Sequence, residues 1–396
     1  MNPIPLGLCP PLSVQKTPQW TQKRVAITGM NNRPDNPGPG YATARCLREH
    51  EEFAGDIIGL GYDVLDGGLY HPDICSSSYL LPWPSSGEAA LLLRLQQIHQ
   101  ENPFDVLIPC LDSELVAFSR LAPALADSGI HTLLPEPSLV GRRDKDRLPE
   151  LCQAAAVSTP AIRHLTHPRF FLDCEREGWS YPLVVKGRFY DAVVASNATM
   201  ATAAFHKLAG EWGLPILAQQ YIAGQEFNIC ALGDGEGNSL GMVMMRKRAL
   251  TEKGKAWAGT TIEHPLLEAI AQRLIEQLRW PGPMEIEMIC DSQGKFHLLE
   301  INPRFPAWVY LTHGAGCNLP ARLLQYISHG RCATEKARSG MTFIRYAEEQ
   351  IVPMAELEAM TVNGSRILST GFSKTQCVAN TRVTVQLIDQ DLERIL

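Results

Sequence analysis

The stretch from residue 283 to residue 304 constrains the fold more than any other part of the chain. Its first half alternates acidic and apolar side chains, so Glu285 and Glu287 share one face of an extended strand. A turn rich in Asp, Ser and Gly separates this strand from a second extended run. The pattern predicts a two-stranded hairpin in which Glu287 faces Glu300, with Asn302 following on the same side as Glu300.

Carboxylates that face one another repel, and they are costly to bury without partners, so a core position does not explain them. Oxygen ligands of this kind suit Mg²⁺, which takes one or two protein carboxylates and leaves its other positions to water and nucleotide phosphates. Glu287, Glu300 and Asn302 are therefore the candidate metal ligands. Arg304 is placed to neutralise the charge on a transferring phosphoryl group. The alternative is an exposed acidic hairpin with a solvated face.

This hairpin resembles the metal-binding hairpin of the ATP-grasp superfamily, in the branch that contains biotin carboxylase and the large subunit of carbamoyl phosphate synthetase. In that branch a Glu or Gln on one strand and a Glu-x-Asn-x-Arg on the next hold the magnesium ions of ATP. The resemblance implies ATP and Mg²⁺ (or Mn²⁺) as cofactors. It also implies an α/β and α+β fold, with a Rossmann-like pre-ATP-grasp domain followed by a two-subdomain ATP-grasp fold. The matching positions here are Glu287, Glu300, Asn302 and Arg304.

Other motifs occur in the family's order along the chain. The resemblance assigns Lys145, in an Asp-Lys pair, and Lys186, at the end of the apolar run YPLVVK, to the ATP phosphates. It assigns the strand ILAQQYI to the adenine edge, and the Glu after the next glycine turn to the ribose hydroxyls, which suit a carboxylate acceptor. The residues assigned to the base and the ribose are Gln219, Tyr221, Ile222 and Glu226.

The chain departs from the family directly after Lys186. Where biotin carboxylase has a long glycine-rich flap, residues 187–192 contain one glycine, and Arg188 is a candidate for part of the flap's role. Further on, alternation places Arg246 and Arg248 on one face of a strand, as candidates for binding the γ-phosphate or a substrate carboxylate. A solvated face explains these two arginines equally well.

Two neighbouring stretches receive different predictions. Residues 253–261 form a polar stretch with Trp257 and Gly259, which suits a mobile lid loop. Residues 265–278 have the periodicity of an amphipathic helix.

Near the N-terminus, short apolar runs alternate with helical patterns, which predicts a parallel sheet with its ligands at the carboxyl ends of the strands. Strands are expected at residues 24–28, 61–65 and 104–109, and helices at 41–50 and 87–101. Asp112 and Glu114 follow the last of these strands. They suit either the capping of a helix or contact with substrate, and both roles can hold at once.

These elements divide the chain into five predicted segments. They are an irregular N-terminal arm (1–22), the Rossmann-like domain (23–140), a small ATP-grasp subdomain (141–222), a catalytic subdomain with the hairpin (223–335) and a strand-rich C-terminal extension (336–396).

Composition limits the partners and the location. The net charge of -6 gives no basic footprint for nucleic acid. Eleven cysteines without a Cys-x-x-Cys pair favour free thiols in a reducing compartment over a disulfide framework or a structural zinc site. No apolar run approaches the ~18 residues of a membrane helix, and the first twenty residues lack a signal-peptide pattern. We therefore expect a cytoplasmic protein without nucleic-acid or membrane partners.

The activity implied by the resemblance is ATP-dependent ligation of a carboxylate to an amine, through an acyl phosphate and with release of ADP and phosphate. The expected substrates are small molecules, an amino acid or a small peptide among them, and relatives are commonly homodimers. One alternative is a carboxylase-like enzyme, which the missing flap and the absence of an Ala-Met-Lys-Met motif disfavour. The other is a nucleotide-binding regulator or scaffold with degenerate catalysis.

Overall fold

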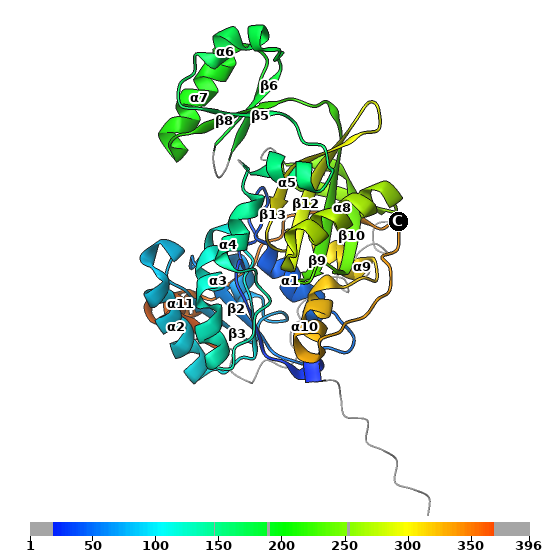
Figure 1. Cartoon of the computed structure of the whole chain (residues 1–396). Helices are drawn as coiled ribbons and strands as arrows, with labels where there is room; N and C mark the ends of the chain where they lie inside the picture. Colours follow the sequence, from blue (N-terminus) through cyan, green and yellow to red (C-terminus); the bar gives the residue numbers. More distant parts are fainter. Residues whose placement is uncertain (1–18, 146, 188–190, 252–253, 368–396) are drawn as a thin grey trace, which may run out of the picture.

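The computed structural model describes residues 19–145, 147–187, 191–251 and 254–367. These residues form three β-sheets with helices packed on them, as Figure 1 shows. The predicted α/β and α+β class is confirmed. The domain boundaries given above remain predictions, and most of the expected N-terminal arm, together with Arg188, lies outside the described residues.

The first sheet has the strand order β15-β3-β2-β1-β4. Its four N-terminal strands are parallel, as predicted, and the last strand of the described chain is added antiparallel at the edge. The strand expected at 61–65 lies earlier, at 57–61. The strands are β1 (Val25–Ile27), β2 (Ile57–Gly61), β3 (Ser77–Leu80), β4 (Val106–Ile108) and β15 (Ser365–Ile367).

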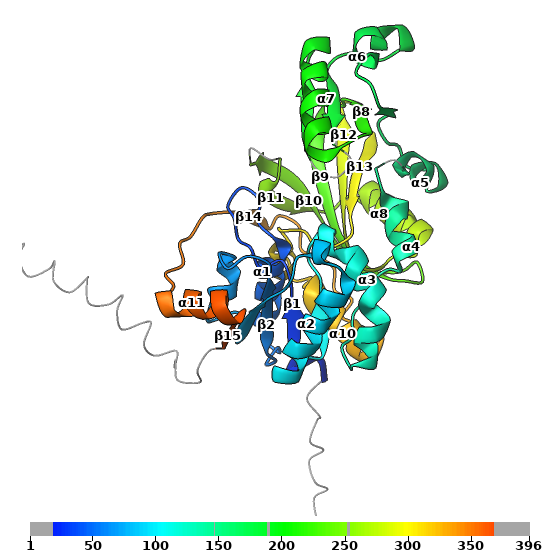
Figure 2. The ribbon, with the colours of Figure 1, turned by 90° about the vertical axis from the view of Figure 1, so that its left-hand side faces the viewer.

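Helices cover both faces of this sheet. Side chains of α1 pack with Val25 and Ile27 of β1 in one core cluster, and side chains of α2 and α3 pack with Ala26 of the same strand in another. Figure 2 shows the red α11 beside this sheet, next to the strand with which the described chain ends. The helices are α1 (Pro39–Arg48), α2 (Glu88–Glu101), α3 (Asp112–Asp127) and α11 (Met354–Asn363).

The central sheet has six antiparallel strands in the order β13-β12-β9-β10-β11-β14. Its strands are β9 (Gly224–Asp234), β10 (Ser239–Leu250), β11 (Ala256–Ile262), β12 (Pro281–Asp291), β13 (Phe296–Asn302) and β14 (Thr342–Ile344). Residues 256–262 thus form a strand, which corrects the prediction of a lid loop. Gly259 lies within this strand, where a Cβ would come within 2.5 Å of Met245 Sδ on the neighbouring strand.

Helices also pack on the central sheet. Helix α8 covers one face with Leu267, Ile270 and Leu274, and its bounds agree with the predicted helix 265–278. A proline at its first position and a hydrogen bond from the Leu267 amide to the His264 ring form its N-terminal cap. The helices of this region are α4 (Pro137–Val140), α5 (Leu148–Ala154), α8 (Pro265–Leu278), α9 (Tyr310–Gly314) and α10 (Leu319–His329).

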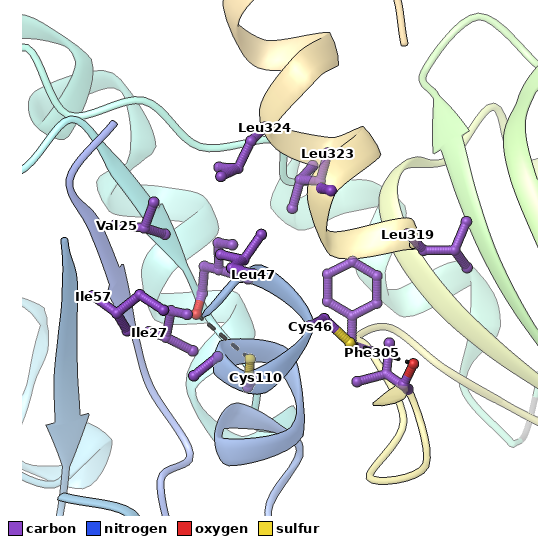
Figure 3. Close-up of a cluster of buried hydrophobic side chains, with 14 of the residues drawn as sticks. Val25, Ile27, Cys46, Leu47, Ile57, Cys110, Phe305, Leu319, Leu323 and Leu324 are labelled. Atoms are coloured by element: carbon purple, nitrogen blue, oxygen red, sulfur yellow. Dashed lines mark hydrogen bonds between the residues drawn. The ribbon is translucent and has the colours of Figure 1, made fainter. Parts of the chain in front are cut away.

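The other face of the central sheet meets the N-terminal sheet through α1 and α10. Figure 3 shows Ile27 of β1, Leu47 of α1, and Phe305 and Leu319 of the central region in one buried cluster. Phe305 follows the hairpin directly, so this cluster fixes the hairpin relative to the N-terminal sheet.

The third sheet stands apart at the top of Figure 1 and has the strand order β5-β8-β6-β7, all antiparallel. Helix α7 packs on it through Ala201, Phe205 and Leu208. Its elements are β5 (Ile162–Leu165), α6 (Phe170–Asp173), β6 (Leu183–Lys186), β7 (Ala192–Ala195), α7 (Ala198–Trp212) and β8 (Ile216–Gln220).

Candidate active site

The hairpin has the predicted register. Glu287 pairs with Glu300 across β12 and β13, and Glu285 pairs with Asn302. The turn forms because Asp291 Oδ1 accepts hydrogen bonds from the amides of residues 293 and 295, and Gly294 takes the left-handed conformation. Asn302 Nδ2 donates to Glu287 Oε1 at 2.9 Å and to Glu285 Oε2 at 3.2 Å. The structure therefore brings together the three candidate metal ligands.

Glu285 is a central residue of the site that sequence analysis did not include among the ligands. It is 5% exposed. Its carboxylate accepts hydrogen bonds from Asn228 Nδ2 at 2.6 Å, Trp308 Nε1 at 2.7 Å, and Asn302 and Arg304. Four donors satisfy the acceptor capacity of a carboxylate, so Glu285 organises its neighbours rather than offering a free oxygen. Its alternation with Glu287 was the available sequence signal.

Arg304 is buried between two carboxylates. Its Nε donates to Asp112 Oδ2 at 2.9 Å and its Nη1 to Glu285 Oε2 at 3.1 Å. Burial disfavours the guanidinium charge, but Asp112 and Glu285 outweigh it and raise the pKa of Arg304. Because Asp112 begins α3, this arginine connects the N-terminal domain to the hairpin. Its contact with a phosphoryl group remains a prediction.

Asp112 and Glu114 have separate roles. Burial works against the charge of Asp112, but the guanidinium of Arg304 lowers the pKa of its carboxyl. Glu114 is fully buried and accepts hydrogen bonds from the Cys110 and Leu111 amides at the start of α3. Glu114 therefore caps this helix, which agrees with the capping role that the sequence suggested.

Lys247 is the cation of β10 that reaches the hairpin. Its Nζ lies 2.7 Å from Glu226 Oε2 and 3.2 Å from Glu287 Oε2, and the residue is 8% exposed. Burial raises the pKa of Glu287, but the positive charges of Lys247, Lys255 and Arg304 together outweigh burial and lower that pKa to about 2. Sequence analysis missed Lys247 because alternation shows which side chains share a face, not which face meets the hairpin.

Arg246 and Arg248 are not brought to the hairpin carboxylates. Arg248 Nε donates to Thr260 Oγ1 at 3.1 Å, and Thr260 is the cross-strand partner of Arg246. Residues that pair across a ladder share a face, so both arginines lie on the face opposite Lys247.

Two lysines from other segments approach the hairpin. Lys145 Nζ lies 3.6 Å from Glu300 Oε1. Lys186 ends β6 of the third sheet, where burial lowers the pKa of its ammonium while the charge of Glu300 opposes that shift. Cations from three segments thus surround Glu287 and Glu300.

The residues predicted to line the base lie at the junction of the third and central sheets. Gln219 is buried in β8, and Tyr221 and Ile222 follow that strand. Glu226 is near the start of β9, within reach of Lys247. Glu226 therefore lies close to the hairpin carboxylate Glu287, and the predicted base residues precede it along the chain.

The donor set fits a magnesium ion. Among the described residues, no group of three or more His, Cys, Asp or Glu side chains is placed to hold a metal ion. Mg²⁺ does not require one, because two carboxylates and an amide leave positions for phosphate oxygens and water. Glu287, Glu300 and Asn302 supply that set from adjacent strands.

Comparisons with known proteins agree with this geometry. Residues 214–350 match a family model described as ATP-grasp in the biosynthetic pathway with Ter operon. No curated protein sequence matches the chain significantly.

Solved structures share the fold. L-amino acid ligase from Bacillus licheniformis is 20% identical, with a TM-score of 0.57 over 78% of this chain and 75% of that one. Biotin carboxylase from Campylobacter jejuni, in a β-γ-ATP complex, is 15% identical, with a TM-score of 0.62 over 81% and 74%. N5-carboxyaminoimidazole synthetase from Staphylococcus aureus, complexed with ADP, is 14% identical, with a TM-score of 0.59 over 80% of each chain.

Within the parts of the chain that the structure describes, no helix combines the length and apolar character needed to cross a bilayer. Residues 214–350 match an ATP-grasp family model, and the chain shares its fold with these solved ligase and carboxylase structures.

Proposed function

We propose that this protein is an ATP-dependent ligase that joins a small-molecule carboxylate to an amine and releases ADP and phosphate. The observation that carries the proposal is the hairpin, where Glu287 and Glu300 face each other with Asn302 beside them. Lysines from two other segments approach the same carboxylates. Carboxylates for a metal ion and lysines for phosphate oxygens are together what a nucleoside triphosphate with its metal requires. Two of the proteins that share the fold, an amino acid ligase and an ADP-bound synthetase, support the same reaction class.

The reaction has two steps. A carboxylate oxygen of the substrate attacks the γ-phosphorus, the bond to the β,γ-bridging oxygen breaks, and ADP leaves. The amine nitrogen then attacks the acyl carbon, phosphate leaves with the bonding electron pair, and the amine loses a proton. Lys145 and Lys186 orient the triphosphate and neutralise its charge, and Glu226 holds the ribose. Glu287, Glu300 and Asn302 would hold Mg²⁺, which supplies further charge neutralisation on the phosphates.

The location and the assembly are part of this proposal. The nine cysteines in the described residues are free, which supports a reducing, cytoplasmic compartment. The homodimer implied by the resemblance is checked by light scattering on the purified chain.

The test is phosphate release from Mg-ATP by the purified protein, with pooled amino acids, dipeptides and small carboxylic acids. A condensed product in mass spectrometry names the carboxylate and the amine. We expect Glu300→Gln to lower turnover at least 100-fold without changing the circular dichroism spectrum, because one metal-binding carboxylate is lost.

The matched control is Glu268→Gln, which changes an exposed glutamate of α8 that pairs with Lys336. Unchanged turnover in Glu300→Gln contradicts the metal assignment. Nucleotide binding without turnover in any pool supports the regulator instead, and phosphate release that depends on bicarbonate alone supports a carboxylase.

A further inference from the structure

The ammonium of Lys247 lies against the carboxylate of Glu287, which is a candidate metal ligand. Both oxygens of Glu287 have donors, since Oε1 accepts from Asn302 Nδ2 at 2.9 Å and Oε2 accepts from Lys247 Nζ at 3.2 Å. The Lys247 side chain is 6% exposed, so bulk solvent does not screen this contact well. A divalent cation that binds Glu287 must therefore displace or repel a buried positive charge.

Lys247 has a second partner. Its shorter contact, 2.7 Å, is with Glu226, on the neighbouring strand β9. Sequence analysis assigns Glu226 to the ribose and Glu287 to the metal. One ammonium thus joins the two parts of the site, and a change at either carboxylate changes the charge balance at the other.

We propose that Lys247 is a positioning residue that excludes a free divalent cation from the hairpin until nucleotide binds, so that metal and nucleotide enter together. This inference rests on the proposed function. The bound triphosphate brings negative charge and oxygen ligands that a lone cation lacks, and these offset the repulsion between Lys247 and the metal. While the site lacks nucleotide, Lys247 supplies the positive charge that Glu287 and Glu226 require.

The geometry separates Lys247 from the other nearby cations. Lys145 is 3.6 Å from Glu300, beyond hydrogen-bonding distance, and contacts the opposite carboxylate of the hairpin. Arg304 is engaged by Asp112 and Glu285. In the described residues, Glu287 forms an ion pair with Lys247, and the charge of Lys255 also acts on this carboxylate.

The test measures Mn²⁺ binding to the full chain by electron paramagnetic resonance, first without nucleotide. We expect Lys247→Met to bind Mn²⁺ at least tenfold more tightly than the wild type, because the competing charge is gone. Lys247→Arg should keep the weak wild-type binding, since it keeps the charge. Lys336→Met, which removes an exposed lysine from its pair with Glu268, is the matched control and should match the wild type.

The same titration with ADP present completes the test. Nucleotide should increase Mn²⁺ affinity more in the wild type than in Lys247→Met, so the coupling shrinks in the variant. Equal Mn²⁺ affinity of wild type and Lys247→Met without nucleotide overturns the inference. Lys247→Gln, which also removes the charge, decides the question if Lys247→Met does not fold.

Failure of the proposed function has a different signature. In that case the wild type releases no phosphate in response to any carboxylate and amine, whereas the comparison of Mn²⁺ affinities without nucleotide does not depend on turnover.

Discussion

The Glu287 carboxylate is held by Asn302 on one oxygen and by Lys247 on the other. Its pKa of about 2 lies below the ordinary value of 4.5, because the charges of Lys247 and its neighbours Lys255 and Arg304 together outweigh the effect of burial. A carboxyl group whose pKa is depressed by folding stabilises the folded state only while it is ionised. That stabilisation is complete well above pH 4.5 and disappears as the pH falls towards 2.

We therefore predict that the stability difference between wild type and Glu287→Gln depends on pH. At pH 7 the wild type should be the more stable by up to about 3 kcal/mol, from ~1.4 kcal/mol per unit of pKa shift. The difference should shrink steadily below pH 4.5. Thermal melting of both proteins between pH 3 and 7 measures it, with Glu268→Gln as a control whose difference stays flat. A difference that does not change with pH contradicts the ion pair.

Some residues of the site could be predicted from the sequence and others could not. The pairing of Glu287 with Glu300 followed from alternation, because both strands of the hairpin and its turn are local. The contact of Lys247 with Glu287 could not be predicted in this way. The two residues lie on strands β10 and β12, which are separated by β9 in the sheet, so the contact depends on how all three strands pair. The local pattern of Arg246, Lys247 and Arg248 is the same for either orientation.

At the scale of elements, strong local signals gave correct boundaries. Helix α8 has periodicity and an N-terminal proline, and its predicted range agrees with the structure. Residues 256–262 were predicted as a loop, but β10 and β14 pair with them on both sides. The glycine that suggested a loop, Gly259, lies in the strand, where a Cβ would require the Met245 and Phe343 side chains to shift.

The C-terminal strand β15 is another element that depends on distant partners. It pairs antiparallel with β3, and Arg366 opposite Ser78 is 7% exposed. Arg366 Nη1 donates to the Leu69 carbonyl at 3.2 Å, and its Nε bonds to Glu356 of α11. This arginine therefore ties both β15 and α11 to the N-terminal sheet.

We predict that Arg366→Ala lowers stability by about 2 kcal/mol, because a charged donor of hydrogen bonds is lost and Glu356 loses its partner. Hydrogen exchange should show faster exchange at the backbone amides of β3 and unchanged exchange in α8. The control is Ile367→Ala, since Ile367 is 66% exposed. If the amides of β3 are equally protected from exchange in Arg366→Ala and in the wild type, Arg366 does not hold β15 against β3.

At the scale of the whole molecule, the candidate site draws its residues from three separate parts of the fold. The third sheet contributes Lys186, the central sheet contributes the hairpin, and the N-terminal domain contributes Asp112. The Asp112–Arg304 pair spans 192 positions in sequence, and no local pattern links these residues. The resemblance supplied the order of the motifs, but the contact that joins the domains required the structure.

Asp112→Asn should weaken the contact between Asp112 and Arg304. The variant keeps the size of the side chain but leaves the buried Arg304 with Glu285 as its remaining carboxylate partner, and breaking a buried pair on one side costs about 3 kcal/mol. We expect a lower melting temperature and faster hydrogen exchange at both α3 and β13, since the contact restrains both elements. Glu88→Gln is the matched control, because it breaks an exposed pair with Arg120, worth at most about 1 kcal/mol. If the two variants lose the same stability, or if exchange rises in α3 alone, Arg304 does not couple the N-terminal domain to the hairpin.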